Sequence, residues 1–335
     1  MKPRWFTLMT VSVLAVAFVP AAWGKTLVVD NDAADCPNAQ FTSIQSAVNA
    51  AQAGDTIRVC RGTYEEAVTI ATPAKNDLRV RAQGRRGDVV VDANDALAGF
   101  LLENVSGVVI RGFTVQEGHE SNIWLRAGAN QNRITRNVAR GPSGHDGIRL
   151  DGANGNWIVH NVAFGNGNSA NGCGIDLLTG SSGNIVRHNL VFDNDRAGIR
   201  LLAAGSGNVV RHNRANSNGR NGILNQSTAG TRIAHNRTHA NTGVGAELGD
   251  GIRLTSSSGV TVAHNKSRNN TGDGIRADSD ATANVIARNR MSGNVEFDCR
   301  DDSVGAGTVG TANLWVRNHG LTENRPGLCK KPGAP

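Results

Sequence analysis

Aromatic side chains are scarce in this chain of 335 residues: Phe, Trp and Tyr make up 4%, with a single tyrosine. An aromatic platform on which sugars could stack is therefore not evident. Dense basic runs are also absent, because the arginines are spread through the chain, and this argues against nucleic acid as a partner. No Asp or Glu cluster has the spacing of a calcium loop or of paired glycosidase carboxylates.

A long apolar run occurs only near the start of the chain. Lys2 and Arg4 precede it, and the small residues Ala22 and Gly24 suit cleavage by a signal peptidase. The run is short for a membrane span. We therefore expect a signal peptide at 1–24, a secreted or periplasmic mature protein, and no membrane span after its removal. The mature chain keeps 33 basic and 28 acidic residues, a net charge of +5, which suits an anionic polymer as partner.

One phrase recurs six times between residues 147 and 290. It begins with Gly-Ile, returns every 23 to 29 residues, and alternates with a second phrase that ends in asparagine. A fixed period in the twenties indicates a solenoid, whose core forms only when neighbouring units stack. The Gly-Ile copies begin at Gly147, Gly174, Gly198, Gly222, Gly251 and Gly274, and the asparagine phrases end at Asn137, Asn161, Asn189, Asn213, Asn236, Asn265, Asn289 and Asn318.

The apolar runs inside each repeat are two to four residues long and rich in Ile and Val, which favours short strands over helices. Asparagine suits the corners between strands, because it tolerates left-handed backbone and bonds to nearby main chain. Stacked coils would place equivalent asparagines about 4.8 Å apart, in a ladder. The sequence predicts an all-β, single-stranded right-handed parallel β-helix of roughly eight to ten coils.

With these repeats, the chain resembles the pectate-lyase-like superfamily over about residues 26–329. It is most similar to bacterial β-helix repeat proteins, which include the accessory protein of nitrous-oxide reductase and the mannuronan epimerases. The resemblance implies secreted or periplasmic proteins, many of which act on polysaccharides. One fold hosts many activities, so the site must be argued from residues.

The ends of the chain differ from the repeats. Residues 41–53 place Ile44, Ala47, Val48 and Ala51 at helical spacing, which predicts a short amphipathic helix that covers the open end of the core. Thr42 or Ser43 could cap it. The expected organisation is signal peptide 1–24, N-terminal cap 25–56, β-helix 57–320, and closing segment with tail 321–335.

Five cysteines accompany the predicted export. Proximity along the chain favours one disulfide between Cys36 and Cys60 at the first end and another between Cys299 and Cys329 at the other. Each closes a loop of 24 or 30 residues, worth about 3–4 kcal/mol in the chain-entropy model. Cys173 remains, and we expect it to be a buried thiol. The protein is expected to be a monomer.

Three columns of the repeat could carry chemistry. The residue two after each glycine faces outward and brings Arg149, Asp176 and Arg200 onto three successive coils. One interpretation is a cross-strand charge ladder. The other is a substrate groove, in which arginine neutralises a uronate carboxylate and an acid or base moves the C5 proton. Trp124, in the same column, and Trp157 are the candidate substrate-binding aromatics.

The second column precedes the glycine and contains Asp146, next to His145. Mannuronan epimerases carry Asp-Pro-His-Asp in this kind of place, and this chain keeps only the His-Asp of that passage. The resemblance implies His145 as acid or base, with Asp146 orienting it. Asp250 and Asp273 in the same column are interpreted as turn formers.

A third column, before the corner asparagine, holds five histidines in succession. We interpret it as a structural or solvated ladder, with copper or zinc binding as the weaker alternative. Three hypotheses follow: a cofactor-free protein that binds or acts on anionic polysaccharide, as a lyase or C5-epimerase if catalytic; a non-catalytic scaffold; and a metal-linked accessory protein. The histidines are His160, His188, His212, His235 and His264.

Overall fold

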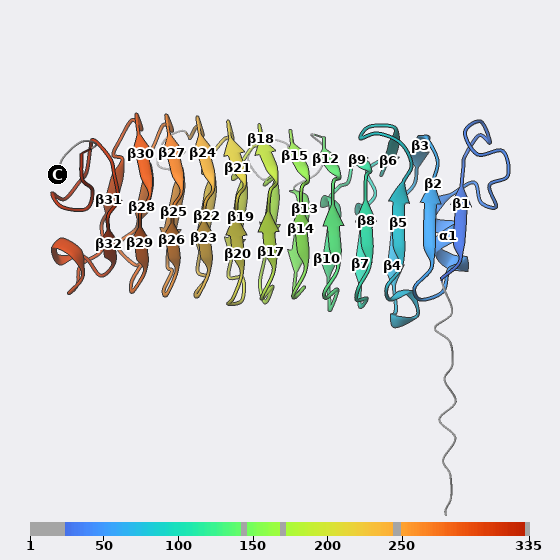
Figure 1. Cartoon of the computed structure of the whole chain (residues 1–335), viewed down its shortest axis with the longest axis horizontal. Coiled ribbons are helices and arrows are strands. Elements are labelled where there is room, and N and C mark those ends of the chain that lie inside the picture. The colour runs from blue at the N-terminus through green and yellow to red at the C-terminus, as the bar shows by residue number, and fades with distance from the viewer. Residues whose placement is uncertain (1–23, 142–145, 168–171, 244–248, 332–335) are drawn as a thin grey trace, which may run out of the picture.

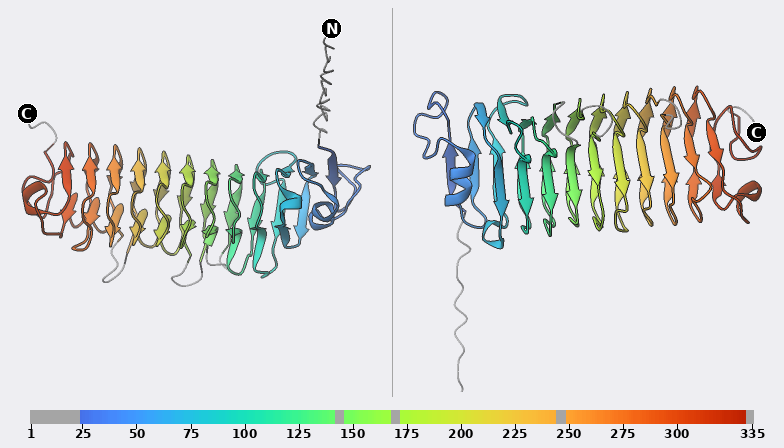
Figure 2. Two further views of the ribbon diagram at one scale, coloured as in Figure 1. Left: turned by 90° about the horizontal axis from the view of Figure 1, so that it is seen from below. Right: turned by 180° about the vertical axis from the view of Figure 1, so that it is seen from behind.

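The computed structural model describes residues 24–141, 146–167, 172–243 and 249–331. Short parallel strands stack along one long axis, from β1 and α1 at one end to β32 at the other (Figure 1). The same order of coils is seen from below and from behind (Figure 2). Each complete coil contributes one strand to each of three sheets. The sheets are named A, B and C in the order in which their strands follow one another along the chain.

Every strand pairs in parallel with its counterpart on the next coil. Sheet A contains β1 (Thr26–Val29), β2 (Thr56–Val59), β5 (Arg79–Ala82), β8 (Val109–Arg111), β11 (Arg133–Thr135), β14 (Trp157–Val159), β17 (Ile185–Arg187), β20 (Val209–Arg211), β23 (Arg232–Ala234), β26 (Thr261–Ala263), β29 (Val285–Ala287) and β32 (Leu314–Val316). Sheet B contains β3 (Gly62–Glu65), β6 (Val89–Asp92), β9 (Thr114–Gln116), β12 (Val138–Arg140), β15 (Val162–Phe164), β18 (Leu190–Phe192), β21 (Arg214–Asn216), β24 (Arg237–His239), β27 (Lys266–Arg268) and β30 (Arg290–Ser292). Sheet C contains β4 (Val68–Ala71), β7 (Ala98–Glu103), β10 (Ser121–Arg126), β13 (Asp146–Asp151), β16 (Ile175–Leu177), β19 (Ile199–Leu202), β22 (Ile223–Gln226), β25 (Ile252–Thr255), β28 (Ile275–Ala277) and β31 (Cys299–Asp301).

One short helix, α1 (Ile44–Ala50), lies at the first coil, as predicted. Ser43 is its N-cap, and the Ser43 hydroxyl accepts a hydrogen bond from the backbone N–H of Ser46. The four apolar residues at helical spacing are all buried in the core. The helix therefore covers the end of the apolar interior, which would otherwise face water. Two 3-10 turns, η1 (Pro73–Lys75) and η2 (Thr308–Gly310), lie outside the sheets.

Asparagine ladders run along the corners, as the repeats predict. At the turn from sheet A to sheet B, Asn189 Nδ2 donates to Asn213 Oδ1 at 3.0 Å and to the carbonyl of Ile158 at 2.9 Å, while Asn189 Oδ1 accepts from the backbone N–H of Asn161. Each amide thus satisfies backbone groups that a corner leaves without a sheet partner. Equivalent links join Asn137, Asn161, Asn189, Asn213, Asn236, Asn265, Asn289 and Asn318.

The cysteines are arranged as predicted. Disulfides join Cys36 to Cys60 and Cys299 to Cys329, one at each end of the stack. Cys173 is a free, buried thiol that packs with Ala197 and Leu224 in a small cluster separate from the main core. The two cross-links lie where a solenoid has a neighbour on one side only and is most prone to fray.

Candidate functional site

The outer face of sheet C carries a polar or large residue at the predicted position of each coil. Arg149, for example, lies between Ile148 and Leu150, which are completely buried. Because side chains alternate along a strand, Arg149 points away from the core. Parallel pairing places its counterparts in one row along the axis: Trp124, Arg149, Asp176, Arg200, Leu224, Arg253, Arg276 and Arg300.

Asp176 and Arg200 form a buried bidentate ion pair in this row. Arg200 Nε donates to Asp176 Oδ1 at 2.9 Å, and Arg200 Nη2 donates to Asp176 Oδ2. Asp176 is completely buried and Arg200 is 7% exposed. Burial disfavours the charged guanidinium, but the hydrogen bonds and the charge of Asp176 outweigh it, so the pKa of Arg200 lies above its ordinary value. Arg200 therefore stays charged and already has a carboxylate partner.

Asp146 lies beside this pair, on the preceding coil. It is buried, and its Oδ1 accepts the backbone N–H of Cys173 at 2.9 Å. Burial, and secondly the negative charge of Asp176, raise the pKa of Asp146 well above its ordinary value. A carboxyl in this setting retains its proton to higher pH and can act as an acid.

Trp124 and Arg149 border the same cluster, but Trp124 is not a free platform. The guanidinium carbons of Arg126 and Arg149 lie 4.8 and 4.7 Å from the centroid of its ring, and the residue is 7% exposed. Arg149 Nη1 also bonds Glu120 Oε2 at 3.0 Å. These cation–π contacts cover the ring. A shallow depression of about 570 Å³ lies over Trp124, Arg126 and Arg149.

The other predicted aromatic, Trp157, lies on a different sheet. It belongs to β14 of sheet A, is 39% exposed, and has the guanidinium carbons of Arg133 and Arg187 at 5.9 and 5.4 Å from its ring centroid. The structure therefore does not bring Trp157 together with Trp124. His145 lies outside the described residues.

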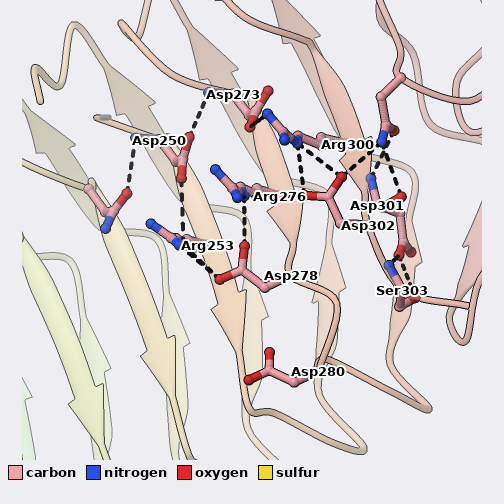
Figure 3. A network of polar contacts seen from close by, with 12 residues as sticks. Asp250, Arg253, Asp273, Arg276, Asp278, Asp280, Arg300, Asp301, Asp302 and Ser303 are labelled. Atoms are coloured by element: carbon pink, nitrogen blue, oxygen red, sulfur yellow. Dashed lines mark hydrogen bonds and ion pairs between the residues drawn. The ribbon is translucent and has the colours of Figure 1, made fainter. Parts of the chain in front are cut away.

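A second polar cluster, around Asp250 and Asp273, was not identified as a site from the sequence (Figure 3). Both residues, interpreted from the sequence as turn formers, are completely buried. Asp250 Oδ1 accepts the backbone N–H of Asp273 at 2.7 Å, and Asp273 Oδ1 accepts that of Phe297 at 2.9 Å. Among the described residues, the second carboxyl oxygen of each has no hydrogen-bond donor.

The burial of these carboxyls changes their acidity. Desolvation raises the pKa of Asp250 to about 6. Desolvation, together with the charge of Asp250, raises the pKa of Asp273 to about 7. The signal that could have identified them was the repeat Gly-Asp-Gly-Ile-Arg, which begins at Gly249 and again at Gly272 and puts an acidic residue in one column of two successive coils.

The arginines in front of these carboxyls are shared with other aspartates. Arg253 Nε lies 4.0 Å from Asp250 Oδ2, and Arg300 Nη1 lies 3.7 Å from Asp273 Oδ2. Arg253 Nη2 lies 2.9 Å from Asp278 Oδ2, and Arg276 Nε lies 2.6 Å from Asp278 Oδ1. Arg300 Nε lies 2.9 Å from Asp302 Oδ2 (Figure 3). The charged row of sheet C is therefore neutralised from coil to coil.

The predicted histidine column forms a solvated stack. Successive rings from His160 to His264 have centroids 4.9 to 5.1 Å apart and planes within 10° of parallel. All five histidines are exposed and have positive φ angles at the turn from sheet A to sheet B.

Two groups of side chains in the described ranges are close enough together to share a metal ion, and neither includes this column. Cys36 and Cys60 of one group form a disulfide. The other is Asp146, Cys173 and Asp176, where burial raises the pKa of the Cys173 thiol and Arg200 binds both oxygens of Asp176. Metal binding would require a deprotonated thiol and carboxylate oxygens without other partners, and this group provides neither at Cys173 and Asp176.

The stacked parallel strands and the asparagine ladders define a right-handed parallel β-helix, as predicted. A family profile described as "Right handed beta helix region" matches residues 98–250. No curated protein sequence matches the chain. None of the helices in the described ranges has the length and apolar character needed to cross a lipid bilayer.

Solved structures with this fold include enzymes that act on polysaccharides. The A-module of the mannuronan C-5 epimerase AlgE4 from Azotobacter vinelandii has a TM-score of 0.63 at 16% identity, covering 87% of this chain and 95% of its own. An alginate lyase from Paenibacillus sp. str. FPU-7 has a TM-score of 0.59 at 16% identity, covering 81% and 97%. An endo-xylogalacturonan hydrolase from Aspergillus tubingensis has a TM-score of 0.58 at 12% identity, covering 92% and 100%. At these identities the likeness establishes the fold.

Proposed function

We propose that this protein is an exported enzyme that acts on an anionic, uronate-type polysaccharide along the outer face of sheet C. The observation that carries the proposal is Asp146, a buried carboxyl with a raised pKa, beside the arginine row. The epimerase and the lyase of the same fold support a polysaccharide substrate, and two disulfides support export into an oxidising compartment.

The chemistry of uronate lyases and C5-epimerases suits these groups. Both reactions remove the proton at C5, and the negative charge that develops on the adjacent carboxylate needs a cation nearby. Arg149 is partly exposed at the rim of the depression, and we assign it this role. We assign Asp146 as the group that delivers a proton and His145, its neighbour in the sequence, as the base. Return of a proton to the opposite face of C5 gives the epimer. Alternatively, the glycosidic C4–O bond breaks, the leaving oxygen takes up a proton, and a sugar with a C4–C5 double bond remains.

Arg200 and Asp176 are assigned a positioning role. Their bidentate pairing fixes one edge of the site and keeps a charged guanidinium next to Asp146. Arg253, Arg276 and Arg300 continue the row along the axis, where each is paired with an aspartate.

A non-catalytic scaffold is the second candidate. It is favoured by ion pairs between neighbouring coils, since a charge ladder that serves only to align the coils requires this pattern. The pairs are Arg200–Asp176, Arg253–Asp278, Arg276–Asp302 and Arg300–Asp273.

The test uses the mature protein, residues 25–335, with a panel of uronans and neutral glycans. Unsaturated products are followed by ultraviolet absorbance, cleavage by reducing ends, and epimerisation by exchange at C5 in deuterated water. We expect activity on at least one uronan. Asp146→Asn and His145→Ala should each lower kcat by about 100-fold or more.

Arg149→Gln should lower both kcat and kcat/KM, because it removes the cation that stabilises the charge developing on the substrate carboxylate. The matched control is Arg268→Gln on the exposed face of sheet B, which should leave turnover unchanged. Absence of turnover with every polymer, in a protein with an intact thermal transition, would reject the enzyme and favour the scaffold.

A further inference from the structure

The vertex between sheets A and B lies opposite sheet C in each coil and carries charge of one sign. We call it the histidine edge, and its members occupy the left-handed turn position that precedes each ladder asparagine. All of them are exposed. They are Arg136, His160, His188, His212, His235, His264, Arg288 and Arg317.

The edge is rigid because the asparagine ladder lies directly beneath it. Asn161 and Asn189, which follow His160 and His188, are buried and bonded to the coils on both sides. The rings therefore stand at one fixed spacing of 4.9–5.1 Å along a straight axis. Such regularity presents one imidazole edge per coil to an extended ligand.

Cations flank the histidines on both sheets. Three hollows of about 490, 210 and 440 Å³ follow the edge, and no acidic residue lines them in the described part of the chain. The Nε atoms of Arg187 and Arg211, on sheet A, are buried without a hydrogen-bond partner among the described residues. The basic residues lining the hollows, beyond the edge itself, are Arg86, Arg111, Arg237, Lys266, Arg290 and His319.

We propose that the histidine edge is a binding site for an extended anionic polysaccharide, which lies along the rod axis and is held more tightly as the imidazoles become protonated. The site is separate from the sheet C face, and its existence does not depend on catalysis there. Regularly spaced carboxylate or sulfate groups would meet one cationic residue on each coil.

The geometry favours a polysaccharide over a nucleic acid. Proteins that bind single-stranded nucleic acids stack bases on free aromatic faces. On this edge, each inner ring such as His188 has both faces covered by neighbouring rings, at 5.0 and 5.1 Å. Only ring edges and guanidinium groups are available, and these suit carboxylate or sulfate oxygens.

The environment makes the charge of the edge depend on pH. Burial, followed by neighbouring histidines and arginines, lowers the pKa of His188 and His212 below the ordinary value. Burial and arginines, including Arg136 and Arg187, do the same for His160. For His264 the causes are burial, then His235, Arg288 and Arg232. The charged groups that act on these four rings are all basic and disfavour their protonation, whereas a bound polyanion would favour it.

The test measures the affinity of the mature protein for a uronan by calorimetry at about pH 5 and about pH 8, either side of the ordinary imidazole pKa of about 6.5. We expect about tenfold tighter binding at the lower pH, with proton uptake. The double variant His188→Asn/His212→Asn should reduce this difference measurably, because asparagine keeps the left-handed turn but cannot be protonated, while His160, His235 and His264 continue to titrate. The control is His239→Asn, a histidine of sheet B outside the column, which should behave as wild type.

Two further measurements separate this site from the proposed active site. Asp146→Asn should keep the pH-dependent binding even if turnover is lost, and the double histidine variant should keep turnover of short oligomers. Affinity that is independent of pH, or a pH dependence that is undiminished in the double variant, would overturn the proposal. So would binding of neutral dextran as tight as that of the uronan, or tighter binding of single-stranded DNA to the edge.

Discussion

Sheet C and the histidine edge both carry basic side chains on most coils, yet their surroundings are opposite. On sheet C, Arg200 and Arg253 each have an aspartate within hydrogen-bond distance. On the edge, the hollows around His160 and His235 are lined by no acidic residue in the described ranges. The same repeat thus builds one face whose charges are satisfied internally and one whose charges remain for a ligand. Paired charges mainly specify the structure, whereas unpaired charges are available for binding.

The largest expected effect comes from the ladder under the edge. Asn189→Ala would leave the buried N–H of Asn161 without its partner and would remove the bonds from Asn189 Nδ2 to the carbonyl of Ile158 and to Asn213 Oδ1. At about 1–3 kcal/mol for the orphaned N–H and about 1 kcal/mol for each lost bond, the loss should be about 4 kcal/mol in the free energy of unfolding. His188→Ala, one residue away on the exposed side, should cost less than about 1 kcal/mol at pH 8. Urea titration of both variants checks this contrast, and equal losses would contradict it.

Breaking the buried pair of sheet C comes next. Arg200→Leu would leave the Asp176 carboxylate buried without its partner, and we expect a loss of about 3 kcal/mol. The double variant Asp176→Leu/Arg200→Leu should recover most of this stability, because it removes both desolvated charges. On the flank of the edge, Arg237→Leu is the exposed counterpart and should change stability by less than about 0.5 kcal/mol. Thermal unfolding of the three proteins would show whether burial decides the difference.

In the second cluster, removing the charge of Asp250 should increase the free energy of unfolding. The folded pKa of Asp250 is about 6, above its unfolded value of 3.8, so its contribution is fully present below 3.8 and is lost as pH rises through 6. Asp250→Asn keeps the acceptor for the backbone of Asp273 but cannot ionise. The variant should therefore be more stable than wild type by about 2 kcal/mol at pH 8, and this gain should disappear in acid. A constant difference across the pH range would refute the raised pKa.

The sequence predicted those features that one repeat and its neighbour determine. The corner asparagines, the end helix and the two disulfides depend on local spacing and on stacking, so the period was enough to place them. The sheet on which Trp157 lies and the burial of Asp250 depend on how the coils are arranged in space, which the repeat alone did not predict. Trp124 and Trp157 lie in different phrases of the repeat, and only the turns between strands decide which sheet each phrase occupies. Asp250 lies in a Gly-Asp-Gly context that is typical of turns, and its burial arises from the coil beside it.

The smallest effect tests the charge of the edge without a ligand. Because the folded pKa values of His188 and His212 lie below the ordinary value, the stability linked to their neutral forms is present above about pH 6.5 and is lost as pH falls through the folded pKa. His188→Asn/His212→Asn should therefore unfold at a higher temperature than wild type at about pH 5 and at the same temperature at about pH 8. Since the rings are exposed, solvent screening keeps the gain below about 1 kcal/mol.

A uronan added at pH 5 should raise the Tm of wild type more than that of the variant, because it relieves repulsion that only protonated rings experience. A variant less stable than wild type at low pH would show that the stacked rings attract one another more than their charges repel, and the edge would then be a structural ladder like the asparagines beneath it.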